Sequence, residues 1–199
     1  MKTILQLNSS IFSDGGQSST LANEFVAGFP HAEVIRRDLA SDPVPHLDAA
    51  RFSAFVTPKE KRNPEQDQVV AYSDKLVSEL KRADTIVLGL PMYNFGLPST
   101  LKAYFDHIAR AGVTFKYTEK GAVGLLTGKK AYIFATRGGY YAGKPNDTQT
   151  SYVRDFLAFL GITDIQFVYA EGLAIGEPVK LASLAKARES LHNLVPAFA

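Results

Sequence analysis

Three short segments carry side chains whose types and spacing suit the binding of a small ligand. The first, residues 8–20 (NSSIFSDGGQSST), combines hydroxyls with two adjacent glycines and leads into a helical pattern. Backbone N–H groups and the dipole at the start of a helix attract phosphate. The segment has no lysine, and neither G-x-x-x-x-G-K-[ST] nor G-x-G-x-x-G occurs, which argues against an NTP-hydrolysing P-loop and a dinucleotide fingerprint. A neutral, hydroxyl-rich loop suits a monophosphate; the alternative is an ordinary helix N-cap.

The second and third segments supply the groups that a flat ring needs. Residues 91–98 (PMYNFGLP) place two aromatic rings, a thioether and an amide between prolines, and apolar walls with a few polar groups suit a flat ligand. In residues 136–140 (TRGGY), the N–H groups of two glycines could reach the pyrimidine edge of a flavin, where negative charge builds on reduction. The plainer alternatives are a satellite core patch and a tight turn. A phosphate loop and a flat-ring loop together indicate flavin mononucleotide (FMN).

The composition narrows the chemistry further. The 199 residues include no cysteine, which excludes disulfides, thiolate catalysis, cysteine-bound zinc and cysteine-ligated iron–sulfur clusters. The four histidines lack metal-ligand spacing, so no metal site is expected, and no serine–histidine–acid or paired-carboxylate pattern is persuasive. This fits flavin chemistry, in which the cofactor carries the difficult step. With a formal net charge of +2 and no long basic block, we expect no nucleic-acid partner.

The densest basic stretch is KEKR at residues 59–62. We interpret it as a solvated loop. The alternative is that this segment folds over the mouth of the site, where Lys59, Lys61 or Arg62 would meet the 2′-phosphate of NADPH. No apolar run reaches the about 18–20 residues of a membrane span. The first apolar run is shorter than the about 7–15 residues of a signal peptide's core, so we expect a cytoplasmic protein without membrane contact.

Alternating strand and helix patterns predict the scaffold that positions these segments. Strands are predicted at 2–7, 32–39, 85–90, 130–136 and 165–172; helices at 18–29, 48–55, 64–83, 98–112, 150–161 and 177–195; and a possible small hairpin within 113–129. Gly112 is expected to end the fourth of these helices, on which Asp106 would pair with Arg110. The alternation predicts one α/β domain over residues 1–199, with a five-stranded parallel sheet and helices on both faces. Ligands bind beyond the carboxyl ends of such strands, where the three segments fall.

Several motifs give the chain a family resemblance over essentially its whole length. They are SSI at 9–11, GQS at 16–18, PMYNF at 91–95, RAGVTFKYTEKG at 110–121, LTGKKA at 126–131, TRGG at 136–139 and FLGITD at 159–164. With these motifs, of which PMYNF is the most specific, the sequence resembles the FMN-dependent NADH azoreductases, relatives of the flavodoxin-like NAD(P)H quinone reductases. The resemblance implies a flavodoxin-like fold, bound FMN, and a homodimer with two active sites at the subunit interface.

The resemblance also implies roles for individual residues. Those implied to bind the FMN phosphate are Ser10, Gly16, Gln17 and Ser18. Those implied to line the isoalloxazine ring are Pro91, Met92, Tyr93, Asn94 and Phe95, with Asn94 positioning the flavin. Those implied to meet its pyrimidine end are Thr136, Arg137, Gly138 and Gly139, and those implied to shape the substrate slot are Tyr117 and Phe159. One departure is Gly16, where a serine is expected in close relatives; a hydroxyl is lost there and a backbone N–H remains.

We therefore expect an FMN-dependent NAD(P)H oxidoreductase that reduces quinones and aromatic azo compounds. NADH, or NADPH, would reduce the flavin at N5 and leave before the acceptor binds the same face, which gives two-electron, ping-pong transfer. Two alternatives stay open. A flavodoxin-type electron carrier tends to be strongly acidic around its flavin, whereas this chain is slightly basic; a non-catalytic nucleotide-binding module would be colourless as purified. The sequence names neither the physiological acceptor nor the preferred nicotinamide cofactor.

Overall fold

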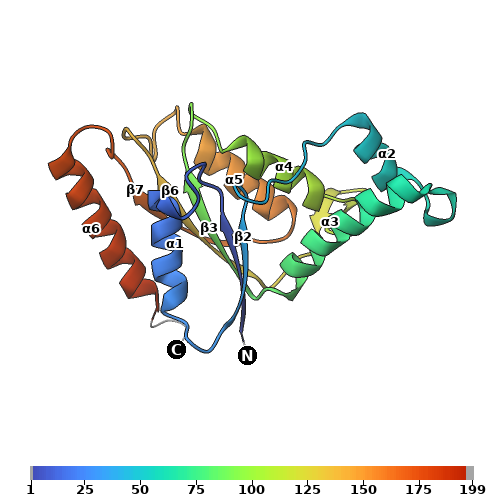
Figure 1. Ribbon diagram of the computed structural model, residues 1–199, viewed down its shortest axis with the longest axis horizontal. Coiled ribbons are helices and arrows are strands. Elements are labelled where there is room, and N and C mark those ends of the chain that lie inside the picture. The colour runs from blue at the N-terminus through green and yellow to red at the C-terminus, as the bar shows by residue number, and fades with distance from the viewer. Residues whose placement is uncertain (1, 196–199) are drawn as a thin grey trace.

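The computed structural model describes residues 2–195, and five parallel strands form its main sheet (Figure 1). The strands are β1 (Thr3–Asn8), β2 (Glu33–Asp38), β3 (Thr85–Pro91), β6 (Lys130–Thr136) and β7 (Asp164–Ala170). Their order, β2-β1-β3-β6-β7, is the flavodoxin-like arrangement of a doubly wound sheet. The predicted fold class is confirmed, and each predicted strand is present with small shifts at its ends.

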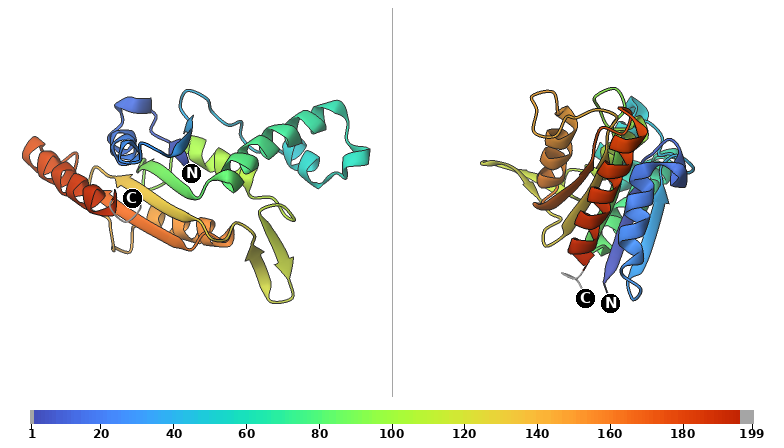
Figure 2. Two further views of the ribbon diagram at one scale, coloured as in Figure 1. Left: turned by 90° about the horizontal axis from the view of Figure 1, so that it is seen from below. Right: turned by 90° about the vertical axis from the view of Figure 1, so that its left-hand side faces the viewer.

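Helices cover both faces of this sheet (Figures 1 and 2). On one face lie α1 (Gln17–Ala27) and α6 (Glu177–Leu194); on the other lie α3 (Pro64–Arg82), α4 (Ser99–Ile108) and α5 (Thr148–Phe159). Because successive strand residues point to opposite faces, Val87 packs in the core under α1, whereas Ile86 and Leu88 pack in the core under α3–α5. Every residue of β3 is buried, which explains its lack of polar alternation. None of the helices within residues 2–195 is long and apolar enough to cross a bilayer.

Helix α4 ends at Ile108, four residues before the predicted terminator. The Thr114 hydroxyl accepts a hydrogen bond from the Arg110 N–H at 3.0 Å and donates one to the Ile108 carbonyl at 2.6 Å. A side chain thus satisfies the end of the helix before the glycine is reached. The predicted pair between Asp106 and Arg110 is also wrong, because the Arg110 guanidinium turns to Asp74 of α3.

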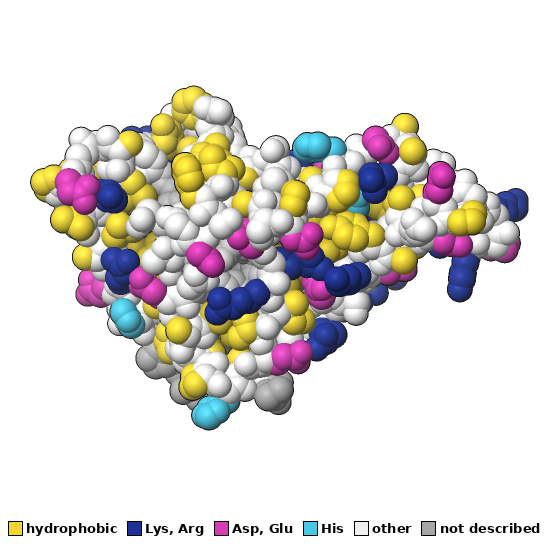
Figure 3. Space-filling model, in the orientation of Figure 1, with side chains coloured by type: hydrophobic (Ala, Val, Ile, Leu, Met, Phe, Trp, Pro, Cys, Tyr) yellow, Lys and Arg dark blue, Asp and Glu magenta, His cyan; other side chains and the backbone are white. Residues whose placement is uncertain are grey.

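An arm projects from one side of the sheet (right in Figure 1). It consists of α2 (Ala49–Val56), the short helix η2 (Lys59–Lys61) and the outer part of α3. The short helix predicted near 48–55 is therefore confirmed. The KEKR segment, residues 59–62, follows α2 at the outer end of the arm, away from the strands of the main sheet (Figure 1), and Figure 3 shows Lys and Arg side chains at this end of the molecule. The alternative that KEKR covers the site of its own chain is wrong, since the long α3 carries it outward.

The predicted hairpin is present as β4 (Phe115–Thr118) and β5 (Gly121–Gly124), a separate antiparallel pair that stands off the main sheet (Figure 2, left). Its base packs tightly on the turn after α5. A Cβ atom on Gly124 would lie 2.0 Å from the Gly161 nitrogen, so a glycine is needed for this approach.

Candidate functional site

The three segments singled out from the sequence meet at the carboxyl edge of the sheet. They form the β1 loop (residues 9–16), the β3 loop (92–98) and the β6 loop (137–146). The strand register brings the loops level, because Asn8 pairs with Gly89 and Pro91 pairs with Thr136. The Met92 N–H also donates to the Thr136 carbonyl at 2.9 Å, so the β3 and β6 loops leave the sheet side by side.

The start of α1 is suited to an anion. Its N-cap is Gly16, which offers no side-chain cap, whereas Asp48, Asn63 and Asp147 cap α2, α3 and α5 with their side chains. In the first turn of α1, the Ser18 hydroxyl is fully buried and has no hydrogen-bond partner within the described chain. An unsatisfied buried hydroxyl costs about 1–3 kcal/mol. A phosphate would satisfy the open N–H groups of the helix end, and it would meet the Ser18 hydroxyl once that side chain turned out of its buried position.

Ser10 and Gly16 face each other across the β1 loop. The Ser10 hydroxyl accepts from the Phe12 N–H at 3.2 Å and lies 3.4 Å from the Tyr93 hydroxyl. A Cβ atom on Gly16 would lie 2.1 Å from Ser10 Oγ, so the serine expected at position 16 would displace the Ser10 side chain. The glycine keeps the Ser10 hydroxyl between the β1 and β3 loops. Gln17 is half-buried at the same helix end.

A polar brace lies beneath the β1 loop. Asp14 Oδ1 accepts from the side-chain amides of Asn8 at 3.4 Å and Asn23 at 3.2 Å, and Gln6 donates to Asn23. These contacts hold η1 (Ser13–Gly15) against β1 and α1. Our sequence reasoning missed this brace; its signal was two polar residues, Gln6 and Asn8, inside an apolar strand. It also missed Ser19, whose buried hydroxyl has no partner among residues 2–195.

The β3 loop is a tight two-residue turn that presents its side chains outward. Tyr93 and Gly96 exchange two backbone hydrogen bonds of 3.1 and 2.9 Å, and the residues between them, Asn94 and Phe95, have φ angles of 49° and 65°. Asparagine tolerates this left-handed region, but a bulky residue such as phenylalanine is a genuine outlier there. Such strain persists only where surrounding contacts impose it. Asn94 and Phe95 are both exposed at the edge.

The first turn of α5 imposes that geometry. Gln149, which is buried, donates from Nε2 to the carbonyls of Pro91 at 2.9 Å and Gly96 at 3.1 Å. The Thr148 hydroxyl donates to the Phe95 carbonyl at 2.7 Å. The sequence placed the start of this helix at residue 150, two residues late, and therefore missed both supports.

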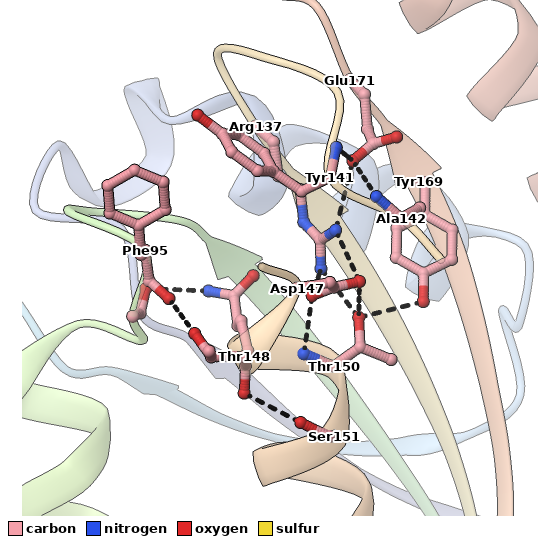
Figure 4. Close-up of polar contacts among 12 residues, drawn as sticks. Phe95, Arg137, Tyr141, Ala142, Asp147, Thr148, Thr150, Ser151, Tyr169 and Glu171 are labelled. Atoms are coloured by element: carbon pink, nitrogen blue, oxygen red, sulfur yellow. Dashed lines mark hydrogen bonds and ion pairs between the residues drawn. The ribbon is translucent and has the colours of Figure 1, made fainter. Parts of the chain in front are cut away.

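Arg137 does not face the open edge. Its guanidinium is fully buried and points between Asp147 and Glu171 (Figure 4). The backbone N–H of Arg137 donates to the Ala170 carbonyl at 2.9 Å. The Arg137 side chain thus lies behind the β6 loop, where its terminal nitrogens are paired and its Nε has no hydrogen-bond partner within residues 2–195; its contact with a ligand stays a prediction. The sequence could not show where this side chain points, because neither acidic partner lies close to Arg137 along the chain.

Gly138 and Gly139 follow Arg137 at the start of the β6 loop. The Arg137 and Gly138 carbonyls, which share peptide planes with the N–H groups of these two glycines, accept from the N–H groups of Leu173 at 3.1 Å and Ala174 at 3.0 Å. In a trans peptide the N–H points away from the carbonyl, so both glycine N–H groups point away from the segment after β7. Neither glycine N–H has an acceptor within the described residues. Two adjacent donors are therefore available beside the β3 loop.

Large hydrophobic side chains form a rim around these loops. Ile11 and Phe12 of the β1 loop, Phe95 of the β3 loop and Tyr140 of the β6 loop are each at least half exposed, and Figure 3 shows hydrophobic surface along this upper edge. Clustered exposed apolar side chains mark binding surfaces. Ile11 and Phe12 were not singled out in the sequence, where they interrupt an otherwise polar segment.

Tyr117 and Phe159 lie apart from the three loops of their own chain. They join one aromatic row through Phe115, whose ring centre is 5.4 Å from that of Tyr117 and 4.3 Å from that of Phe159. Phe159 ends α5, a helix of 12 residues and hence about 18 Å, whose other end supports the β3 loop. The chain by itself does not bring these two residues to the site.

The donor set fits FMN. The uncapped α1 terminus and Ser18 suit a dianionic phosphate, the β3 turn offers a flat apolar wall, and two glycine N–H groups could pair with carbonyl oxygens of the pyrimidine ring. An orphaned buried hydroxyl, exposed aromatics and unpaired donors within one edge have no evident structural purpose without such a ligand.

Comparisons with known proteins agree with this geometry. A family profile described as flavodoxin-like fold matches residues 2–195. An FMN-dependent NADH:quinone oxidoreductase of Cellvibrio japonicus is 57% identical over 201 residues, covering 99% of this chain and 100% of that protein. An FMN-dependent NADH:quinone oxidoreductase of Burkholderia lata is 55% identical over 195 residues, covering 96% and 98%. The crystal structure of an FMN-dependent NADH-azoreductase from Bacillus anthracis in complex with FMN superimposes with a TM-score of 0.86 at 29% identity, covering 98% of this chain and 100% of that one. The chain thus belongs to the family of FMN-dependent NADH:quinone oxidoreductases and NADH-azoreductases with a flavodoxin-like fold.

Proposed function

We propose that this protein is an FMN-dependent NADH:quinone oxidoreductase that also reduces aromatic azo compounds. The observation that carries the proposal is the uncapped start of α1, with the unpartnered Ser18 hydroxyl in its first turn, at the end of a β1 loop that contacts the β3 loop through Ser10 and Tyr93. Two relatives also support the proposal. Both are named FMN-dependent NADH:quinone oxidoreductases, and the chain matches at least 98% of the length of each.

Each loop has a task in this proposal. Ser10, Ser18 and the N–H group of Gln17 hold the phosphate. Gly16, whose own N–H donates to the Ser13 carbonyl at 3.2 Å, leaves room for it at the helix N-cap. The β3 loop, Pro91 to Phe95, lines the ring, and Asn94 sets its position. Thr136, Gly138 and Gly139 lie at the pyrimidine end, where N–H donors stabilise the negative charge that reduction creates. When bound, FMN supplies the capacity to accept two electrons at N5 from NADH and pass them to an acceptor.

A second copy of the chain completes the substrate slot. Tyr117, with a side chain three-quarters exposed on a projecting hairpin, cannot serve the flavin of its own chain. We therefore place Tyr117 and Phe159 over the flavin of a partner in a homodimer.

Two measurements test the proposal. The purified protein should be yellow, and anaerobic NADH should bleach its flavin without any partner reductase; a flavin that only a reductase can reduce would make the protein an electron carrier, and a colourless protein that binds no added FMN would make it a nucleotide-binding module. Because reductant and acceptor would share one flavin face, initial rates against NADH at several quinone concentrations should give parallel double-reciprocal lines. Intersecting lines would rule out the shared slot.

A further inference from the structure

We propose that Arg137, Asp147 and Glu171 form a positioning network that aims the N–H groups of Gly138 and Gly139, so that the protein binds reduced FMN more tightly than it otherwise would. This inference rests on the proposed function. It concerns three side chains that bond to one another and to the backbone of the β6 loop (Figure 4).

Glu171 is the first anchor of the β6 loop. Its Oε1 atom accepts from the N–H groups of Tyr141 and Ala142, both at 2.8 Å, and from Arg137 Nη1 at 3.2 Å. One carboxylate oxygen at the end of β7 thus fastens the middle of the loop. Charge-assisted bonds of this kind are stronger than bonds between neutral groups.

Asp147 is the second anchor and stands at the end of the loop. Its carboxylate pairs with both terminal nitrogens of Arg137, at 2.9 and 3.0 Å, and also caps α5 by accepting from the Thr150 N–H at 3.1 Å. Burial alone would raise the pKa of Asp147, but the hydrogen bonds from Arg137 and Thr150 outweigh burial and hold that pKa below its usual value. The carboxylate therefore stays charged, as the clamp requires.

The two anchors leave the glycine pair little freedom. Gly138 and Gly139 stand between Arg137, which is clamped by both carboxylates, and Tyr141, which is bound to Glu171. Because the Arg137 and Gly138 carbonyls are bonded to the segment after β7, their trans peptides turn the Gly138 and Gly139 N–H groups away from that segment. The clamp is also tied to α5, the helix that supports the β3 loop, so both ring-binding loops share one support.

Fixed donors matter most where charge develops. Reduction adds negative charge at the pyrimidine end of a flavin, and donors that are already oriented stabilise it without reorganisation. Loosening the β6 loop should therefore weaken the binding of reduced FMN more than that of oxidised FMN. The network's own charge acts in the opposite sense, since removing a carboxylate near the ring favours the reduced, more negative form. Loss of positioning and loss of charge thus predict shifts of opposite sign in the ratio of the two dissociation constants, for reduced and for oxidised FMN.

The test compares Glu171→Ala with Glu171→Gln. Both remove the negative charge, but the glutamine oxygen can still accept from Tyr141 and Ala142. Dissociation constants for oxidised and anaerobically reduced FMN are measured by titration of apoprotein. Glu171→Ala should weaken the reduced form about tenfold more than the oxidised form, which lowers the potential of the two-electron couple by about 30 mV. Glu171→Gln should restore the binding ratio to within about threefold of wild type.

A matched control comes from a second buried arginine. Arg37 pairs with Glu79 of α3, and the Glu79 side chain is 14% exposed, as is that of Glu171. Glu79 contacts none of the three loops, so Glu79→Ala should leave the ratio of the two dissociation constants unchanged even if it destabilises the protein. A shift as large as that of Glu171→Ala would overturn the positioning role.

Hydrogen exchange of the apoprotein gives a readout that needs no ligand. The amides of Tyr141 and Ala142 should exchange at least tenfold faster in Glu171→Ala and close to the wild-type rate in Glu171→Gln. Unchanged exchange in Glu171→Ala, or a binding ratio that moves toward reduced FMN in both Glu171 variants, would overturn the inference while leaving the proposed function intact. A wild-type protein that binds no FMN would instead overturn the proposed function itself.

Discussion

Replacing Ser18 with alanine should have opposite effects on the apoprotein and on its complex with FMN. In the apoprotein the hydroxyl is buried without a partner, and alanine removes that unsatisfied group while raising helix propensity. The free energy of unfolding of the apoprotein should stay the same or rise by about 1 kcal/mol, which for a chain of this size raises Tm by about 2–4 °C. A residue that held only the fold together would show a loss.

FMN binding should weaken in the same variant. A hydrogen bond to a charged group contributes about 1.5–3 kcal/mol, and each about 1.4 kcal/mol is a factor of ten in affinity. Ser18→Ala should therefore raise the Kd for FMN about 10- to 100-fold. No lysine or arginine lies in the β1 loop or in α1 to compensate.

Riboflavin binding separates the contribution of the phosphate to affinity from that of the ring. It carries the ring and the sugar chain but no phosphate, so fluorescence titration should give the same riboflavin Kd for wild type and Ser18→Ala. The matched control is Thr20→Val, since the Thr20 hydroxyl already donates to the Gly16 carbonyl at 3.1 Å; its FMN affinity should change by less than about threefold. An unchanged FMN Kd in Ser18→Ala, or an equal loss for FMN and riboflavin, would refute the phosphate assignment.

Three further predictions concern the scaffold and the partner subunit. Gly89→Ala places a Cβ atom 3.0 Å from the Ser18 carbonyl oxygen, so it should destabilise the apoprotein by about 1–3 kcal/mol; an unchanged Tm would contradict the close packing of α1 on β3. Burial lowers the pKa of His107 more than its bond to a backbone carbonyl raises it, so below about pH 6.5 the unfolded chain binds a proton that the folded chain excludes, and stability should fall there with falling pH. In the variant His107→Gln, Tm should depend less on pH in this range than in the wild type. An equal slope of Tm against pH in the variant and the wild type would contradict the role of His107. Tyr117→Ala should raise the KM for quinone several-fold with FMN affinity unchanged, whereas weaker FMN binding with an unchanged KM would count against a place in the substrate slot.

The local sequence determined the scaffold and the position of the binding loops. Apolar runs such as residues 85–90 predicted buried strands, because a strand covered on both faces has no polar side. Strict strand–helix alternation then predicted a parallel sheet, and a parallel sheet brings its carboxyl ends together. The β1, β3 and β6 loops were therefore found at one edge before any contact between them was known. Hydroxyls and glycines at the start of α1 indicated phosphate for the same local reason.

The supports of the site could not be predicted in this way. Gln149 holds the carbonyl of Pro91 across 58 residues, and Glu171 reaches Arg137 across 34. A side chain chooses such partners only after the strands have been paired, and spacing along the chain records nothing of that choice. The start of α5 was misplaced because its cap, Asp147, is fixed as much by Arg137 as by its own helix.

The direction in which the Arg137 side chain points, and the distance of Tyr117 and Phe159 from the binding loops, were likewise decided by tertiary structure alone. The sequence placed Arg137 in a ligand-binding motif, but burial of a guanidinium requires carboxylates around it, and two distant ones draw it behind the loop. Tyr117 and Phe159 stand in family motifs, yet a 12-residue helix separates Phe159 from the β3 loop. The sequence thus determined which elements form and which loops carry the chemistry, because these depend on neighbours along the chain. Only the packed structure decided where each polar side chain points, because that depends on partners from other elements.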